Sequence, residues 1–382
     1  FSQETFTGIQ IVKSNSIQKN KSKEFDNLSE KNKENQINLV KVQALFFPLM
    51  ILLIGISNIL VIYIGGKQYL NGEIENIGII AEFIIYVNML TWPVASLGWI
   101  SSIIQQAEAS QKRINEFLKE KSEIKNNING LKKINGSVEF KDVSFTYIES
   151  NIKAIDKISL KLNKKKSLGI VGVTGSGKTT LIKLLTKSFN IDSGEILFDN
   201  NSIDEFDLEC LRKEIGVVSQ DSFLFSDSII NNIRFGKEKA SLKEVEEVCK
   251  ISGIHNEITK FSNGYETILG ERGINLSGGQ KQRICIARAL IKEPKILILD
   301  DCLSALDTET EEKIIISLKS LLSNTTTIIT SHRLSSVQNQ DEIIVLDKGK
   351  IIQKGNHKLL IKQNGYYKEV YTKQLTKKDD KI

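Results

Sequence analysis

Two long apolar runs stand out in the first third of the chain. Residues Ala44–Ile64 are almost continuously apolar, and a second run extends over Ile77–Ile104. Each is about as long as a helix that crosses a bilayer, which needs roughly 20 residues. Lysines precede the first run and Lys and Arg follow the second, whereas the loop between them holds only Lys67 beside two glutamates. The positive-inside rule then predicts a membrane hairpin with cytoplasmic flanks and an external loop.

The segments around this hairpin are polar. Phe1–Asn35 is rich in lysine with isolated apolar residues, which is typical of solvated helix, and disorder is an alternative. After the second run the helix is expected to continue into the cytosol, and Asn126–Gly136 is expected to be a linker. Glu82, inside the second run, either reaches the outer headgroups or marks a substrate path. Because the chain begins with Phe, we expect its natural N-terminus to be missing.

From Ser137 the hydrophobic period changes. VEFKDVSFTY alternates apolar and polar residues and ISLKLN repeats that signal, which predicts a small antiparallel sheet. Ser167–Val171 and Ile296–Leu299 are continuously apolar and short, as expected for strands of a parallel sheet that is covered on both faces. Ser241–Lys260 has an amphipathic helical pattern, and the end of the chain predicts a hairpin and a helix.

The composition and the positions of the charges indicate which class of molecule the chain binds. The 382 residues are 40% apolar and 26% charged, with a net charge of +6. A basic chain could bind nucleic acid, but the excess lysines flank the apolar runs, so anionic lipid headgroups are the expected neighbour and nucleic acid is not. The four cysteines show no paired or metal-ligand spacing, which indicates reduced thiols in a cytosolic domain.

A glycine-rich loop follows the strand at 167–171. GVTGSGKTT fits the pattern G-x-x-x-x-G-K-[ST], with a strand before it and a predicted helix after it, the context that this motif requires. Its backbone N–H groups would converge on phosphate oxygens, its lysine would neutralise the β- and γ-phosphates, and Thr179 would coordinate magnesium. The predicted nucleotide-binding residues here are Gly172, Thr174, Gly175, Ser176, Gly177, Lys178, Thr179 and Thr180.

A second polar turn, an amphipathic helix and an apolar strand follow one another in Leu276–Asp307. The turn LSGGQ places free N–H groups ahead of a helix, where a phosphate is favoured, and its predicted binding residues are Ser277, Gly278, Gly279 and Gln280. Asp300 and Asp301 emerge at the carboxyl end of the strand, where open α/β sheets bind ligands. Asp300 is expected to hold magnesium.

Taken together, these motifs resemble those of ATP-binding-cassette (ABC) proteins, with their P-loop, signature motif, Walker B strand and D-loop. The resemblance implies that Tyr147 stacks on adenine, that Gln220 reaches magnesium and the attacking water, and that His332 contacts the γ-phosphate. It also places Asp307 in the D-loop, and it assigns the segment ILGERG to exporters. Asp301 departs from the pattern, because the family usually has a glutamate there to polarise the attacking water.

The resemblance extends to the N-terminal part. ETFTGIQIVKS followed by two spans is similar to the last third of an exporter membrane domain, in which that segment is a coupling helix, so four earlier spans would be absent. The expected fold is therefore an α-helical transmembrane segment followed by an α/β P-loop NTPase domain with a parallel core sheet, an antiparallel β subdomain and a helical subdomain. The expected boundaries are 1–125 for the membrane part, 126–136 for the linker, 137–375 for the ATPase domain and 376–382 for a disordered basic tail.

The function that this resemblance implies is ATP-driven export across the plasma membrane. Two nucleotide-binding domains would pair head to tail, with two ATP molecules and Mg²⁺ between them. The aspartate at 301 favours a heterodimer with a second half-transporter, and a homodimer is the alternative. Two other hypotheses stay open: an ATP-binding regulatory subunit, and a soluble P-loop ATPase acting on DNA, which the membrane hairpin opposes. Peptides, lipids and drugs all remain candidate substrates.

Overall fold

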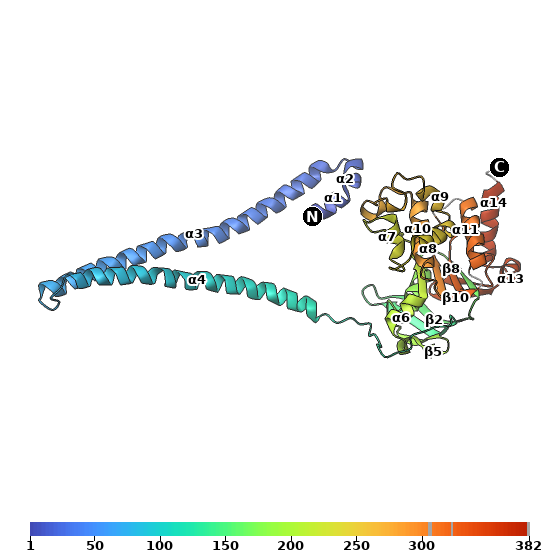
Figure 1. Cartoon of the computed structure of the whole chain (residues 1–382), viewed down its shortest axis with the longest axis horizontal. Coiled ribbons are helices and arrows are strands. Elements are labelled where there is room, and N and C mark those ends of the chain that lie inside the picture. Colours follow the sequence, from blue (N-terminus) through green and yellow to red (C-terminus); the bar gives the residue numbers. More distant parts are fainter. Residues whose placement is uncertain (305–307, 322–323, 380–382) are drawn as a thin grey trace. The chain divides into compact units, whose positions relative to one another are not determined.

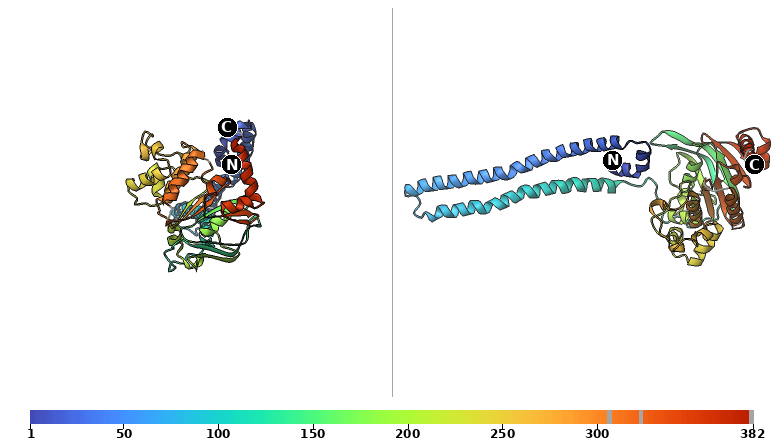
Figure 2. Two further views of the ribbon diagram at one scale, coloured as in Figure 1. Left: turned by 90° about the vertical axis from the view of Figure 1, so that its right-hand side faces the viewer. Right: turned by 90° about the horizontal axis from the view of Figure 1, so that it is seen from above.

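The first of two compact units is a helical hairpin. The computed structural model describes residues 1–304, 308–321 and 324–379, and the chain divides into Phe1–Lys121 and Ser122–Ile382. In the first unit, α3 and α4 lie side by side as a long antiparallel pair (Figures 1 and 2). The helices of this unit are α1 (Ser2–Thr7), α2 (Ile9–Ser14), α3 (Gln18–Leu70) and α4 (Gly78–Lys119).

Both long helices contain a stretch that is apolar and long enough to cross a membrane. These stretches are Ala44–Leu70 and Gly78–Lys119, with mean hydropathy of 2.6 and 1.5 over their most apolar windows, none of which is buried by the rest of the chain. Such exposed apolar surface is typical of a lipid-facing helix rather than of the core of a soluble protein. The helix α3 continues past Ile64 into the polar residues expected as loop, because an established helix extends through polar residues at little cost.

The second unit contains two sheets. The first is antiparallel, in the order β2-β1-β4-β5, and the second has the order β10-β9-β3-β8-β7-β6, in which the last five are parallel and β10 is antiparallel to β9. The strands are β1 (Val138–Tyr147), β2 (Ile152–Leu162), β3 (Ser167–Gly172), β4 (Ser193–Phe198), β5 (Asn201–Ser202), β6 (Ile215–Val218), β7 (Ile296–Asp300), β8 (Thr326–Thr330), β9 (Glu342–Asp347) and β10 (Lys350–Gly355).

Helices pack on both faces of the larger sheet, so its central strands are buried along their whole length. Every residue of β7 and β8 is buried, as a parallel sheet requires. The helices are α5 (Lys178–Leu185), α6 (Leu208–Glu214), α7 (Ile229–Arg234), α8 (Leu242–Ile251), α9 (His255–Ile258), α10 (Gly278–Leu290), α11 (Thr308–Leu321), α12 (Leu334–Val337), α13 (His357–Lys362) and α14 (Tyr366–Asp379), with short 3-10 turns at Ile203–Glu205, Gly264–Glu266 and Glu271–Gly273.

A helical subdomain is formed by α7 to α10. The amphipathic stretch after Ser241 forms two helices, α8 and α9, because Gly253 between them adopts a left-handed backbone with φ of 72°. The side chains of α7 to α10 share one apolar cluster with one face of the larger sheet, and the antiparallel sheet packs into a second cluster on the other face. The predicted fold class is confirmed.

The lysine-rich C-terminal segment differs from the expectation of disorder. α14 extends to Asp379, so residues 376–379 are helical. The helix is anchored near its start by Tyr367, which is fully buried and whose hydroxyl lies 2.7 Å from Nδ1 of His357. From that anchored turn the helix propagates through lysine and glutamine, both good helix formers, so their polarity did not indicate disorder.

Candidate functional site

The loop between β3 and α5 is shaped by two glycines that no other residue could replace. A Cβ on Gly172 would lie 2.3 Å from the carbonyl oxygen of Leu346, and one on Gly177 would lie 2.6 Å from that of Ala154. Gly177 also has a φ of 105°, which favours glycine. The backbone therefore turns tightly around an open cradle, with the free N–H groups of the first turn of α5 facing it.

Lys178, the first residue of α5, is buried under this loop. Its Nζ donates hydrogen bonds to the carbonyl oxygens of Gly172 at 2.8 Å and Val173 at 2.9 Å. Burial lowers the pKa of Lys178, and the carboxylates of Asp301 and Asp300 act in the opposite direction. The ammonium group is therefore held in the cradle with little water, where an anionic phosphate would be a strongly favoured partner.

Two carboxylates lie at the end of β7, and the neighbouring strand β8 holds them. The hydroxyl of Thr330 donates to Oδ1 of Asp300 at 2.6 Å and accepts from the backbone N–H of Asp301 at 3.0 Å. Both carboxylates are buried. Asp301 has a left-handed backbone with φ of 44°, a conformation that aspartate adopts more readily than most residues, and its Oδ1 accepts from the backbone N–H of His332 at 3.4 Å.

An aromatic side chain from the antiparallel sheet stands beside the loop. The ring of Tyr147 contacts the rings of Phe145 and Phe189 edge to face, with centroids 4.9 and 5.5 Å away, and its hydroxyl lies 3.1 Å from Oγ1 of Thr180. These contacts fix the orientation of a half-buried ring whose remaining surface is open to the cavity.

These groups surround one cavity of about 320 Å³. The exposed side chains of Gln220, which follows β6, and of His332, which follows β8, also line it. The structure thus brings together predicted residues from the two sheets and from loops that are far apart in the sequence. The residues lining the cavity are Tyr147, Ile152, Lys153, Ala154, Thr174, Gly175, Ser176, Gly177, Lys178, Thr179, Thr180, Gln220, Asp300, Asp301, His332 and Lys348.

The donors of this cavity fit a magnesium nucleotide. Oγ of Ser176 is buried and has no hydrogen-bond partner within the described part of the chain, so it is available to a ligand. The described residues contain no cluster of three or more His, Cys, Asp or Glu side chains that could hold a metal. Mg²⁺ usually takes one or two protein ligands together with phosphate oxygens. Thr179, Asp300 and Gln220 are the side chains that could hold it here.

The signature turn lies elsewhere and does not line this cavity. Ser277 caps α10: its hydroxyl accepts from the backbone N–H of Gln280, and the side chain of Gln280 accepts from the N–H of Ser277 at 2.9 Å. Ser277 and Gly278 are exposed, and Gly279 is partly exposed. This turn therefore presents its free N–H groups to solvent. The predicted D-loop residue Asp307 lies outside the described residues.

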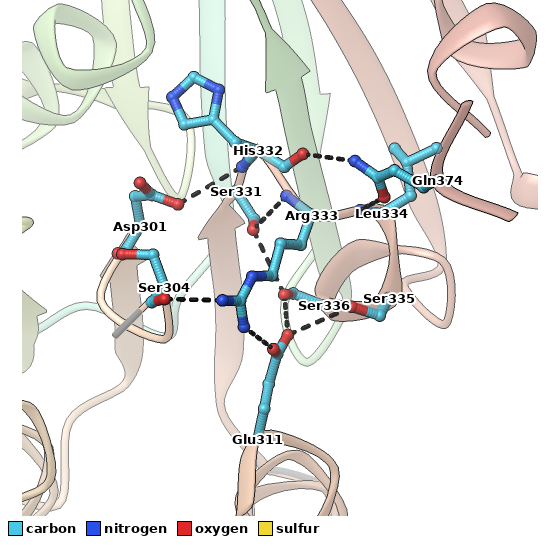
Figure 3. A network of polar contacts seen from close by, with 10 residues as sticks. All are labelled: Asp301, Ser304, Glu311, Ser331, His332, Arg333, Leu334, Ser335, Ser336 and Gln374. Atoms are coloured by element: carbon cyan, nitrogen blue, oxygen red, sulfur yellow. Dashed lines mark hydrogen bonds and ion pairs between the residues drawn. The ribbon is translucent and has the colours of Figure 1, made fainter. Parts of the chain in front are cut away.

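Several polar side chains around the site were not predicted. Figure 3 shows a network in which Glu311 of α11, Arg333 and Gln374 of α14 surround the backbone that carries His332. Thr330 also belongs to this group of missed residues, although its place directly before Ser331 and His332 could have drawn attention to it. Glu311 and Gln374 have no motif around them, and their partners are 22 and 42 positions away in the sequence.

The sequence of the chain is similar to those of known proteins. Residues 155–304 match the family described as ABC transporter. The multidrug resistance-like ATP-binding protein MdlA of Buchnera aphidicola (subsp. Schizaphis graminum) is 41% identical over 97% of this chain and 64% of its own length. The uncharacterized ABC transporter ATP-binding protein YknU of Bacillus subtilis is 38% identical over the same shares. The chain thus spans slightly less than two thirds of these relatives.

A solved structure agrees with these matches. A bacterial Atm1-family ABC exporter with ATP bound superimposes with a TM-score of 0.91 at 29% identity, covering 98% of this chain and 66% of that one. The apolar helices α3 and α4 and these relatives place the protein among multi-pass membrane proteins with a cytoplasmic nucleotide-binding domain. The matched residues are those of an ABC transporter ATPase domain, and the chain as a whole is similar to ABC exporters, in which membrane-spanning helices are fused to such a domain.

Proposed function

We propose that this chain is one half of an ATP-driven exporter whose ATP sites are completed by a second half-transporter. The observation that carries this proposal is the separation of the two phosphate-binding turns. The glycine loop, Asp300, Gln220 and His332 line one cavity, whereas Ser277 and its exposed turn do not contribute to it. A site with both turns needs the signature turn of another nucleotide-binding domain, which is what a head-to-tail pair supplies.

Within one such site each residue has a distinct role. Tyr147 stacks on adenine, the loop N–H groups and Lys178 bind the β- and γ-phosphates, and Thr179 and Asp300 hold Mg²⁺, which neutralises phosphate charge. Gln220 and His332, which line the cavity, are proposed to contact the terminal phosphate. The exposed N–H groups of the partner's signature turn then stabilise that phosphate from the other side, so that closure of the pair depends on ATP.

Asp301 determines how well this chain's own site hydrolyses ATP. Its side chain is one methylene shorter than the usual glutamate, a loss of about 1.5 Å in reach. A misplacement of that size can lower the rate about a hundredfold. The intact signature turn would meanwhile complete a competent site on a partner that carries the glutamate. We therefore favour a heterodimer over a homodimer.

ATPase measurements on three preparations test this. The chain alone is expected to hydrolyse ATP slowly, the chain with its partner rapidly, and Asp301→Glu is expected to raise the rate of the chain alone. Lys178→Ala should abolish nucleotide binding at this chain's own site in each preparation. A fully active chain without a partner would refute the heterodimer, and unchanged ATP binding by Lys178→Ala would refute the site itself.

A regulatory subunit that only binds ATP is a second candidate, which the aspartate at 301 favours. It predicts that turnover at the partner's site persists when Ser277 of this chain is replaced by arginine, whereas the exporter proposal predicts that this turnover is lost. The name of the Buchnera relative makes drugs the first substrates to screen in transport assays with the assembled pair.

A further inference from the structure

The backbone of His332 is held on both sides by polar side chains. Its N–H donates to Oδ1 of Asp301 at 3.4 Å, and its carbonyl oxygen accepts from Nε2 of Gln374 at 2.9 Å. Oε1 of the same glutamine accepts from the N–H of Leu334 at 3.0 Å. The side-chain amide of Gln374 thus makes one hydrogen bond to the residue before Arg333 and one to the residue after it, as the backbone of a neighbouring strand would (Figure 3).

The side chain of Arg333 fixes the same segment through contacts with α11 and with the loop that follows β7. It donates to Oε2 of Glu311 at 3.0 Å and to the carbonyl oxygen of Ser304 at 2.8 Å. The side chain of Glu311 is only 1% exposed and also accepts from the hydroxyls of Ser335 and Ser336. A buried carboxylate with this many donors is costly to move, so it is a rigid support for the loop.

The imidazole of His332 is the part of this segment that the network leaves free. In Figure 3 it points away from Glu311 and Gln374, and it lines the nucleotide cavity as an exposed side chain. The position of the ring is therefore determined by the backbone beneath it. A shift of that backbone would displace the ring and would also remove the N–H from the carboxylate of Asp301.

We propose that Gln374 is a positioning residue for His332, and that the C-terminal helix α14 thereby forms part of the ATP site. The proposal rests on the function proposed above, in which His332 faces the terminal phosphate. Gln374 does not touch the nucleotide. It acts through the His332 carbonyl, and its effect is confined to ligands that carry the phosphate that the histidine contacts.

Because the expected effect of Gln374 is limited to nucleotides with a γ-phosphate, a positioning role can be distinguished from a merely structural one. If Gln374 only fastened α14 to the domain, its loss would weaken ATP and ADP binding alike and would do so with or without the imidazole. If it positions His332, its loss weakens binding of the triphosphate and has no further effect once the imidazole is gone, because residues that act through one another are not additive.

The experiment measures equilibrium affinity of the full chain, in detergent micelles, for the Mg²⁺ complexes of ADP and of a non-hydrolysable ATP analogue. Gln374→Leu keeps the size of the side chain and removes both hydrogen bonds. It is expected to weaken analogue binding about fivefold, the usual effect of a hydrogen bond worth about 1 kcal/mol, and ADP binding less than twofold. Gln374→Glu keeps the acceptor for Leu334 but loses the donor to His332, and is expected to behave similarly. Glu369→Gln, exposed on the same helix, is the matched control and is expected to change neither affinity.

The decisive comparison is the double variant. In a His332→Ala background, Gln374→Leu is expected to change analogue affinity less than twofold. Equal losses for both nucleotides, or a fivefold loss that persists in the His332→Ala background, would overturn the proposal and make Gln374 a structural anchor. Should Gln374→Leu melt at a much lower temperature, the same two criteria apply to Gln374→Glu. The proposed function fails separately if Lys178→Ala binds the analogue like the unmodified chain.

Discussion

At the scale of single residues, the site depends on side chains that serve two partners at once. Thr330 is the clearest example, because its hydroxyl donates to Asp300 and accepts from the backbone of Asp301. It thereby sets the relative position of Asp300, the proposed magnesium ligand, and of Asp301, the carboxylate proposed to face the attacking water. Both bonds lie in a buried environment, where an unsatisfied polar group costs more than on the surface.

Thr330→Val tests this residue. The variant keeps the shape of the side chain but leaves the carboxylate of Asp300 without its hydroxyl donor, so the free energy of unfolding is expected to fall by about 1–3 kcal/mol. The Mg²⁺ concentration needed for nucleotide binding is expected to rise as well. Denaturant titration and Mg²⁺-dependent binding measure the two effects. Thr330→Ser retains the hydroxyl as the control, and a valine variant with unchanged Mg²⁺ dependence would contradict the role.

Tyr147 allows a second test at this scale. Tyr147→Ala removes the ring and is expected to weaken ATP and ADP binding equally, by about 1–3 kcal/mol, because stacking involves the base that both share. Tyr147→Phe loses only the contact with Thr180 and is expected to bind almost normally. Titration with both nucleotides gives the comparison. A selective loss of ATP binding in the alanine variant would show that the ring does not contact adenine.

At the scale of elements, the signature turn is held by the helix α9. Oε1 of Glu257 pairs with the guanidinium of Arg283 at 2.6 Å, and its Oε2 accepts from the side chain of Gln280 at 2.8 Å. Arg283 is nearly buried in α10 and also donates to the carbonyl of Gly253 at 2.9 Å. The position of the exposed turn at Ser277 is therefore set by contacts one to two turns further along its helix.

Glu257→Ala is expected to lower the free energy of unfolding by about 1–3 kcal/mol, because it leaves a nearly buried guanidinium with one partner fewer. It should also weaken ATP-dependent pairing of nucleotide-binding domains, while ATP binding to this chain's own cavity stays unchanged. Thermal melting and analytical ultracentrifugation with nucleotide measure these quantities. The neighbouring exposed residue offers the control Asn256→Ala. Loss of binding in the chain's own cavity would argue against the assigned separation of the two turns.

At the scale of the whole molecule, two units with different surroundings share one chain. The apolar faces of α3 and α4 are exposed along their spans, whereas the second unit encloses two apolar clusters of its own. The first unit therefore needs lipid or further membrane helices to cover it, and the second folds around its own core. Because the second unit follows α4 and is cytoplasmic, the end of α4 is expected to face the cytoplasm and the loop between α3 and α4 to face the outside of the cell.

Cysteine labelling of intact cells tests the topology. Glu73→Cys in the loop after α3 is expected to react with a membrane-impermeant maleimide from outside, and Lys112→Cys near the end of α4 is expected to react only after permeabilisation. Of the natural cysteines, Cys249, Cys285 and Cys302 are buried and Cys210 lies in the cytoplasmic domain, so the unmodified chain provides the background. Labelling of Lys112→Cys in sealed cells would reverse the predicted orientation.

Motifs and periodicity were sufficient to predict most of the fold. Continuous apolar runs predicted β3, β7 and the two spans, and alternation predicted β1 and β2. Prediction was poorest where polarity was a misleading guide. The lysine-rich end is helical to Asp379, and α3 continues into residues expected as loop, because a helix once formed propagates through polar residues and because the buried Tyr367 anchors α14.

The sequence by itself determined which residues are the candidates for phosphate and magnesium binding, because those groups are specified by short patterns in which glycine, lysine and aspartate have few substitutes. Only the tertiary structure decided what holds them. The contacts of Thr330, Glu311 and Gln374 join α11, α14 and the strand ends across 22 to 42 positions of the chain. No local pattern encodes such pairs, since they exist only when packing of the sheet and its helices brings the partners within hydrogen-bonding distance.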